Sequence, residues 1–163
     1  IDWILRHGVR PTVISISMGG IARRALQVLR EVQITGPVSI IIAAGNDGRD
    51  IACSGADYTP PHVTIVGATR PDDRIADISA RGRCVDIYAP GVNVPAAGIS
   101  SQDAEVVATG TSVAAPLVSG AAALWLAEAM AKAPTETFTG GDVKVALLQS
   151  ARRHVLERRG GDP

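Results

Sequence analysis

The sequence has few aromatic residues, only two cysteines and no excess of charge of either sign. Aromatic residues make up 3% of the 163 residues, and 16 Lys and Arg balance 16 Asp and Glu. This balance gives no basic surface that would favour nucleic acid or an acidic membrane. We find no apolar run that approaches the length needed to span a bilayer, and no signal peptide opens the chain. The length suits one domain with its own core.

Apolar runs typical of strands alternate with segments of helical spacing. The β-branched or almost wholly apolar runs predict strands at 13–17, 38–44, 63–68 and 85–90. Helical spacing predicts helices at 21–32, at about 112–131 and at 141–151, and IDWILRHG reads as the end of another helix. This alternation predicts a layered α/β fold with right-handed crossovers.

Two glycine-containing loops follow the first two predicted strands, at 17–20 and 45–48. Ligands of such sheets gather beyond the carboxyl ends of the strands. Asn46 is therefore a candidate side-chain donor, flanked by glycines that let another backbone approach closely. Asn-Asp-Gly also forms turns without any chemistry, and taken alone the turn is the simpler interpretation.

The stretch TGTSVAAPLVSG, residues 109–120, places a hydroxyl at the start of a small, apolar helix. Pro116 is tolerated only near the start of a helix, because proline lacks an N–H and clashes with the preceding turn. The helix must therefore begin near Ser112, which then lies at its positive, N–H-rich end. That position suits a reactive oxygen, and it equally suits an ordinary helix cap.

Together, SISMGG, AAGN and GTSVAAPLVSG resemble, in this order and spacing, the second half of a subtilisin-like serine protease domain. The resemblance covers residues 1–151 and leaves 152–163 as a charged tail without an assigned role. It implies the C-terminal portion of a three-layer α/β fold with a central parallel sheet. The nucleophile signature Gly-Thr-Ser-x-Ala-x-Pro-x-Val-x-Gly is matched at Gly110, Thr111, Ser112, Ala114, Pro116, Val118 and Gly120.

The resemblance implies a serine endopeptidase that hydrolyses peptide bonds through an acyl-enzyme and needs no cofactor for its chemistry. Ser112 would be the nucleophile, and Asn46 would hold the oxyanion together with the Ser112 backbone N–H. The substrate would lie as an extended strand against the cleft, with a large apolar side chain before the scissile bond. The expected substrate-binding residues are Ser17, Met18 and Gly19 at the edge, Ala43, Ala44 and Gly45 as pocket wall, and Gly55 as pocket floor.

Two positions depart from the family's usual signature. Val113 stands where Met usually follows the nucleophile, and Leu117 stands where His usually follows the proline. Neither position is a catalytic group, so activity is not excluded.

A general base for Ser112 is not evident. The family's chain order is Asp, His, Ser, and the first two lie upstream of the matched segments. His7, His62 and His154 do not lie in the family's His-Gly-Thr setting, and we expect each to be an ordinary surface residue. A serine hydroxyl without a base is a poor nucleophile at neutral pH.

Two functional hypotheses follow. The first is a fragment of an active endopeptidase, lacking the Asp and His of the triad, and we favour it because Ser112 and Asn46 are both present. The alternative is a catalytically inactive module that binds peptides or protein partners through the same cleft. A nucleotide or anion site is disfavoured, because neither a Walker lysine nor GxGxxG follows a strand.

Cysteine and acidic positions add two expectations. The sequence alone leaves the pairing of Cys53 and Cys84 open. The resemblance to the proteinase K-like branch implies a disulfide between them, and hence a secreted or extracytoplasmic location. The same branch implies a possible structural Ca²⁺ held by Asp86 and the carbonyls of Pro61 and Val63. Asp86 could instead simply cap or hydrogen-bond a loop.

The fragment hypothesis has a consequence for residues 1–163 made alone. In the family, the strand at 13–17 pairs with a strand of the N-terminal half, so that edge would be bare and prone to association. The helix of Ser112 is apolar on every side and would lose part of its cover. We expect residues 1–163 alone to be inactive and to aggregate or stay partly unfolded. The expected partners are a peptide or protein substrate and the missing N-terminal half, with no nucleic acid and no membrane.

Overall fold

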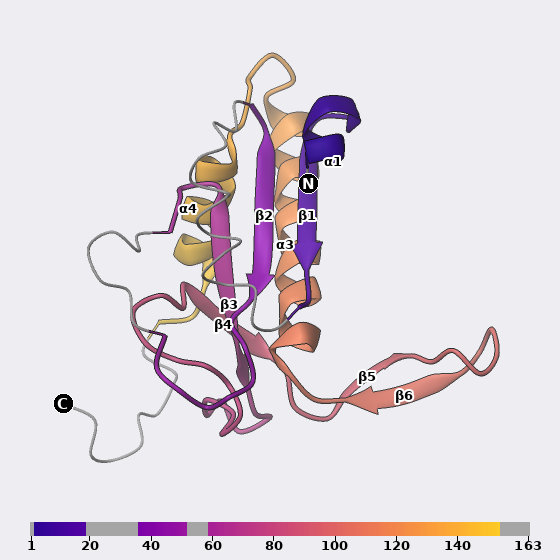
Figure 1. Cartoon of the computed structure of the whole chain (residues 1–163). Coiled ribbons are helices and arrows are strands. Elements are labelled where there is room, and N and C mark those ends of the chain that lie inside the picture. Colours follow the sequence, from indigo (N-terminus) through magenta and orange to yellow (C-terminus); the bar gives the residue numbers. More distant parts are fainter. Residues whose placement is uncertain (1, 19–35, 52–58, 154–163) are drawn as a thin grey trace.

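The computed structural model describes residues 2–18, 36–51 and 59–153 (Figure 1). The helices are α1 (Asp2–His7), α3 (Thr111–Lys132) and α4 (Gly140–Ser150). The strands are β1 (Thr12–Ile16), β2 (Val38–Ala43), β3 (Val63–Thr69), β4 (Ile87–Pro90), β5 (Val94–Ala97) and β6 (Glu105–Ala108). The helix expected at 21–32 lies outside the described residues.

Four parallel strands form the central sheet in the order β1-β2-β3-β4. Every residue of β2 and β3 is buried, which is why their sequences are almost continuously apolar. β1 is an edge strand of the described sheet, and its Ser15 is exposed. All four predicted strands are confirmed, with β4 beginning two residues later than expected. The predicted α/β class with a parallel sheet is therefore correct.

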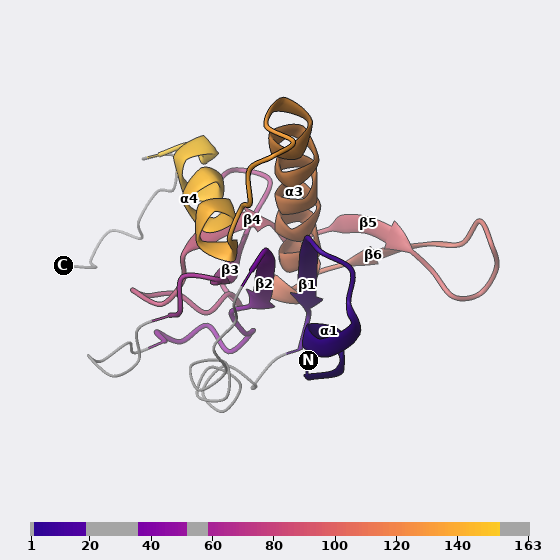
Figure 2. The same ribbon diagram turned by 90° about the horizontal axis from the view of Figure 1, so that it is seen from above.

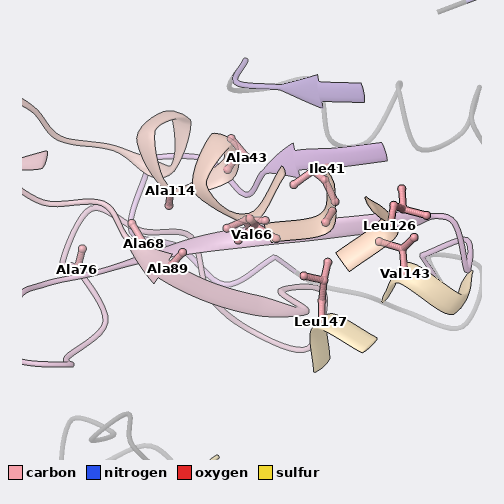
Figure 3. Packing of buried hydrophobic residues seen from close by; sticks show 13 residues of the cluster. Ile41, Ala43, Val66, Ala68, Ala76, Ala89, Ala114, Leu126, Val143 and Leu147 are labelled. Atoms are coloured by element: carbon pink, nitrogen blue, oxygen red, sulfur yellow. The ribbon is translucent and has the colours of Figure 1, made fainter. Parts of the chain in front are cut away.

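Helices cover both faces of the sheet (Figure 2). α3 and α4 pack on one face, where Val66, Leu126 and Val143 belong to a single buried cluster (Figure 3). Ile4 and Leu5 of α1 pack against a second cluster on the opposite face, built around Ile40 and Ile65. The fold is thus layered with the sheet in the middle, as the sequence predicts.

α3 is the central helix and contacts all four strands of the sheet. It begins at Thr111, so the predicted start near Ser112 is confirmed. By length and composition α3 is long and apolar enough to cross a membrane, with a mean hydropathy of 1.5. The expectation that no apolar run in the chain approaches this length is therefore wrong. The buried side chains of α3, among them Ala114, Val118 and Leu126, pack against the sheet, and they make up only 33% of its apolar window.

The β5–β6 hairpin was not predicted from the sequence. Its two antiparallel strands pair Val94 with Ala108 and project away from the sheet (Figure 1). Each strand has only four residues, the first contains Pro95, and the loop at 98–104 lacks a two-residue turn signal. Val107 of this hairpin is 70% exposed.

Candidate active site

Three segments that are distant in sequence meet at the carboxyl edge of the sheet. In Figure 1 the arrowheads of β1 and β2 and the first turn of α3 lie at the same end of the molecule. The Gly45 N–H donates a hydrogen bond to Thr111 Oγ1 at 3.1 Å, across 66 residues of sequence. The Gly110 N–H donates to the Gly91 carbonyl, and the Gly91 N–H donates to the carbonyl of Thr69 at the end of β3. The loop after β2, the end of β3 and the start of α3 therefore meet at this edge, where ligands of such sheets gather, and the part of the loop at 17–20 in this group stays a prediction.

Asn46 is fixed by two hydrogen bonds from Thr111. Its Oδ1 accepts the Thr111 backbone N–H at 2.8 Å and the Thr111 hydroxyl at 2.9 Å. A backbone N–H can only donate, so the amide atom that faces it must be the oxygen. The Asn46 Nδ2 is consequently turned away from Thr111, and it has no hydrogen-bond partner among the described residues. Hydrogen bonds to Oδ1 therefore fix the Asn46 side chain and set the direction of its Nδ2 donor. A residue that only forms a turn does not need its side chain fixed in this way.

Gly110 leaves open the space that Asn46 and Ser112 share. A Cβ at this position would lie 2.9 Å from Ser112 Oγ and 3.0 Å from Asn46 Nδ2. Any side chain there would fill the space between the hydroxyl and the amide donor. The φ of Gly110 is 152°, a backbone conformation that favours glycine for a second reason. The amide and the hydroxyl thus face one small volume at the start of α3.

The first turn of α3 adds a backbone donor. Of its N–H groups, Thr111 donates to Asn46, while Val113 and Ala114 donate to the Gly110 carbonyl at 3.0 and 3.3 Å. Within the described part of the chain, the Ser112 N–H and Oγ have no hydrogen-bond partner. Unpaired N–H groups and the helix dipole make this end positive. A hydroxyl, an aimed amide and a free N–H therefore lie together where a negative oxygen would be stabilised.

Neither described histidine lies near Ser112. His7 ends α1, where its Nδ1 lies 3.0 Å from the Trp3 carbonyl oxygen and its ring stacks on Trp3. His62 directly precedes β3 and packs beside Gly140 of α4. Both residues lie at the amino edge of the sheet, and the seven residues of β3 separate His62 from the carboxyl edge by roughly 20 Å. His154 lies outside the described residues.

The predicted substrate segments are described only in part. Ser17 and Met18 are exposed directly after β1, with Met18 at 60% exposure. The side chains of Ala43 and Ala44 are buried in the two core clusters, so at this edge a ligand could reach mainly their backbone and Gly45. Gly19 and Gly55 lie outside the described residues. The assignment of all these residues to a substrate cleft stays a prediction.

Asp86 lies away from this cluster and is fully engaged. Its Oδ2 accepts the Ile65 N–H at 2.8 Å, and its Oδ1 lies 2.7 Å from Lys144 Nζ. Lys144 also donates to the Val63 carbonyl at 2.9 Å. Pro61 is exposed and lies two residues before β3. The observed partners of Asp86 are thus a residue of β3 and a residue of α4, and both the calcium ligand set and the simple loop role of Asp86 stay predictions.

Cys84 is 3% exposed and is not a free thiol. Cys53 lies outside the described residues, so the pairing of the two cysteines stays a prediction.

Two contributing residues were not assigned a role from the sequence. Thr111 was read only as part of the nucleophile signature, although its hydroxyl joins Asn46 to Gly45. That signature was the available signal. Lys144 gave no signal beyond being one of only two lysines in the chain, because its partners lie on β3 and just before β4.

Comparison of the sequence with known proteins identifies a family and several relatives. The model of the subtilase family matches residues 1–162. The chain is 40% identical over 163 residues to an extracellular serine proteinase of Thermus sp. (strain Rt41A), covering 98% of this chain and 37% of that protein. It is 34% identical over 139 residues to alkaline serine exoprotease A of Vibrio alginolyticus, covering 83% of this chain and 25% of that protein.

A solved structure shows the same fold. The crystal structure of a cold adapted subtilisin-like serine proteinase superposes with a TM-score of 0.74 at 29% identity. The match covers 95% of this chain and 54% of the solved chain. The chain thus spans 37% and 25% of the two relatives and about half of the solved protein. By its sequence match, its fold and the arrangement around Ser112, the chain belongs to the subtilase family of serine proteases.

Proposed function

We propose that this chain is the part of a serine endopeptidase that carries the nucleophile and the oxyanion hole. One observation carries the proposal: Thr111 holds Asn46 so that its Nδ2 and Ser112 Oγ both face the space at Gly110, where a Cβ would lie within 3.0 Å of each. A helix cap would not need a second, independently fixed donor directed at the same volume. A peptidase needs this combination, since the negative oxygen forms next to the attacking hydroxyl.

The residues would act in the following way. Ser112 Oγ attacks the carbonyl carbon of the scissile peptide bond and gives its proton to a general base. The carbonyl oxygen, now negative, accepts hydrogen bonds from Asn46 Nδ2 and from the Ser112 N–H. Collapse of this intermediate releases the amine and leaves an acyl group on Ser112, which water then removes. Because Thr111 and the helix fix both donors beforehand, little reorganisation is needed when the charge forms.

We propose that the general base and its aspartate come from a segment upstream of residue 1. The relatives are about two to four times longer than this chain, and the described histidines lie at the wrong edge of the sheet. β1 is an edge strand of the sheet in the described part of the chain and offers that edge to such a segment. Leu117 and Leu124, seven residues apart on one side of α3, are 46% and 74% exposed and would be covered by it.

The substrate is proposed to be a peptide or protein bound as an extended strand beside Ser17 and Met18. Small wall residues around Gly45 favour a large apolar side chain before the scissile bond. Both relatives are named as proteases, one of them extracellular. Secretion is therefore proposed for this protein as well, and the predicted Cys53–Cys84 disulfide would suit that location.

A fluorophosphonate probe applied to the full-length protein tests this proposal. The probe forms a covalent bond only with an activated serine, and mass spectrometry then locates the adduct. We expect one adduct on Ser112 and none in a Ser112→Ala variant. Ser119→Ala is the matched control, because Ser119 lies two turns along α3 with its hydroxyl spent on the Ala115 carbonyl.

A folded full-length protein without an adduct on Ser112 would overturn the proposal. That result, combined with retained binding of extended peptides, would instead favour the inactive peptide-binding module.

A further inference from the structure

The chain has two lysines, and their side chains differ strongly in solvent exposure. Lys132 lies on the surface of α3 with its side chain 73% exposed, four residues after its partner Glu128. Lys144 lies on α4, and its side chain is 14% exposed against an Asp86 side chain that is 16% exposed. Burying an ammonium is unfavourable unless oxygen atoms replace its water. Lys144 should therefore be held at a dedicated site.

The oxygen atoms around Lys144 are those expected to bind calcium. Its Nζ lies 2.7 Å from Asp86 Oδ1 and 2.9 Å from the Val63 carbonyl oxygen. Asp86 and Val63 are two of the three residues that the proteinase K-like resemblance implies as ligands. The second carboxylate oxygen of Asp86 is occupied by the Ile65 N–H at 2.8 Å. These distances are those of charge-assisted hydrogen bonds to an ammonium.

We propose that the ammonium group of Lys144 takes the place of the structural Ca²⁺ at Asp86. Calcium binds six to eight oxygen atoms at about 2.3–2.6 Å, and it would have to displace Lys144 to reach Asp86 and Val63. If Lys144 stayed, two cations would share a single carboxylate whose other oxygen is already bonded. One fixed positive charge thus joins α4 to β3 and to the start of β4 without a metal ion. The proposal concerns stability and does not depend on peptidase activity.

The start of α4 holds Lys144 in place for this role. The Thr139 hydroxyl accepts the Asp142 N–H, and Asp142 Oδ2 accepts the Thr139 N–H, forming a capping box. Gly140 lies so close to the sheet that a Cβ would be 2.1 Å from the Val38 carbonyl oxygen. Val143, next to Lys144, is buried in the core cluster (Figure 3). The backbone of Lys144 is therefore fixed on both sides, and ordering its side chain costs less entropy than on a mobile segment.

Amine labelling of the full-length protein tests the proposal, with Lys132 as the internal control. The protein is treated with an amine-reactive ester under native conditions, in millimolar Ca²⁺ or in chelator, and labelling of each lysine is followed by mass spectrometry. We expect Lys144 to react on the order of tenfold or more slowly than Lys132, at the same rate in both buffers. Faster labelling of Lys144 in Ca²⁺ would show that calcium displaces it, and labelling as fast as that of Lys132 would show an unheld side chain. Either result overturns the proposal.

An Asp86→Asn variant provides a second test that also needs no activity assay. Removing the carboxylate charge should accelerate labelling of Lys144 severalfold and leave Lys132 unchanged. Asp103→Asn, on the exposed hairpin loop, is the matched control. Unchanged protection of Lys144 in Asp86→Asn would contradict the proposed role of Asp86.

Discussion

Two polar clusters of this molecule, one around Asn46 and one around Asp86, differ in how many of their polar atoms have hydrogen-bond partners. Around Asp86, one cation and one N–H meet the two carboxylate oxygens, and the side chains are mostly buried. Around Asn46, only the amide oxygen has hydrogen-bond partners among the described residues, and Nδ2 of this exposed side chain faces the space at Gly110 that Ser112 Oγ also faces. In the Asp86 cluster both carboxylate oxygens have partners, whereas the Asn46 cluster has a donor available for a bound ligand.

Under the proposed function, this difference separates a stabilising cluster from a catalytic one. Polar groups that support the fold are expected to find partners within it, because an unmet buried group costs free energy. A site that stabilises a transient charge must instead keep its hydrogen-bond donors fixed in position and free of other acceptors. Thr111 is the residue that makes this possible at Asn46, since it fixes the amide without using its donor.

Thr111→Val should give the largest effect among the supporting residues. The variant keeps the shape of the side chain but removes the hydroxyl that bonds Asn46 Oδ1 and accepts the Gly45 N–H. We expect kcat of the full-length enzyme to fall about 10- to 100-fold, corresponding to one or two lost hydrogen bonds in positioning, with KM changed less. Thr111→Ser, which restores the hydroxyl, should recover most of the activity. Equal kcat values for the Val and wild-type proteins would show that Asn46 does not need this support.

Lys144→Met should destabilise the protein without a direct effect on the chemistry. The buried Asp86 would lose its cation, which costs about 1–3 kcal/mol in the free energy of unfolding. The exposed Lys132→Met should cost no more than about 0.5 kcal/mol. Urea denaturation of both variants measures this contrast. A loss for Lys144→Met no greater than for Lys132→Met would mean that the bridge to Asp86 contributes nothing.

Asp142→Asn should give the smallest effect, and that effect should depend on pH. The hydrogen bond from the Thr139 N–H, followed by that of its hydroxyl, lowers the pKa of Asp142 in the folded protein. A lowered pKa stabilises the fold at pH values above the ordinary carboxyl range, and this contribution is lost as the pH falls through the folded-state pKa. Because Asp142 is exposed, we expect a loss of no more than about 1 kcal/mol at pH 7 and less below pH 4. A thermal-unfolding difference that is the same at pH 7 and pH 3 would contradict this.

The sequence predicts the sheet and the main helices well because their signals are local. Runs such as 38–44 and 63–68 are apolar at every position, and only a strand covered on both faces needs that pattern. The β5–β6 hairpin was not predicted because its strands are short and, being partly exposed, do not require a continuous apolar run. Its residues are placed by pairing with each other, as with Val94 and Ala108.

The site was predictable for a different reason, and only in part. Ser112 and Asn46 were found through a resemblance, since each alone is also explained as a cap or a turn. The partners that make them a site come from long-range contacts, such as Thr111 with Asn46 across 65 residues. The same holds for Lys144 and Val63, which lie 81 residues apart. Spacing along the chain carries no information about such pairs.

The kinetics of an Asn46→Ala variant of the full-length protein test the central claim most directly. If Asn46 Nδ2 stabilises the oxyanion, kcat for a peptide substrate should fall by about 10²–10³-fold, the loss known for the corresponding donor in subtilisin, while KM changes little. Gln102→Ala, which removes the amide of an exposed residue on the loop between β5 and β6, is the matched control and should keep kcat near the wild-type value. An Asn46→Ala enzyme with wild-type kcat would contradict the account, because the amide that Thr111 holds beside Ser112 would then have no part in the reaction.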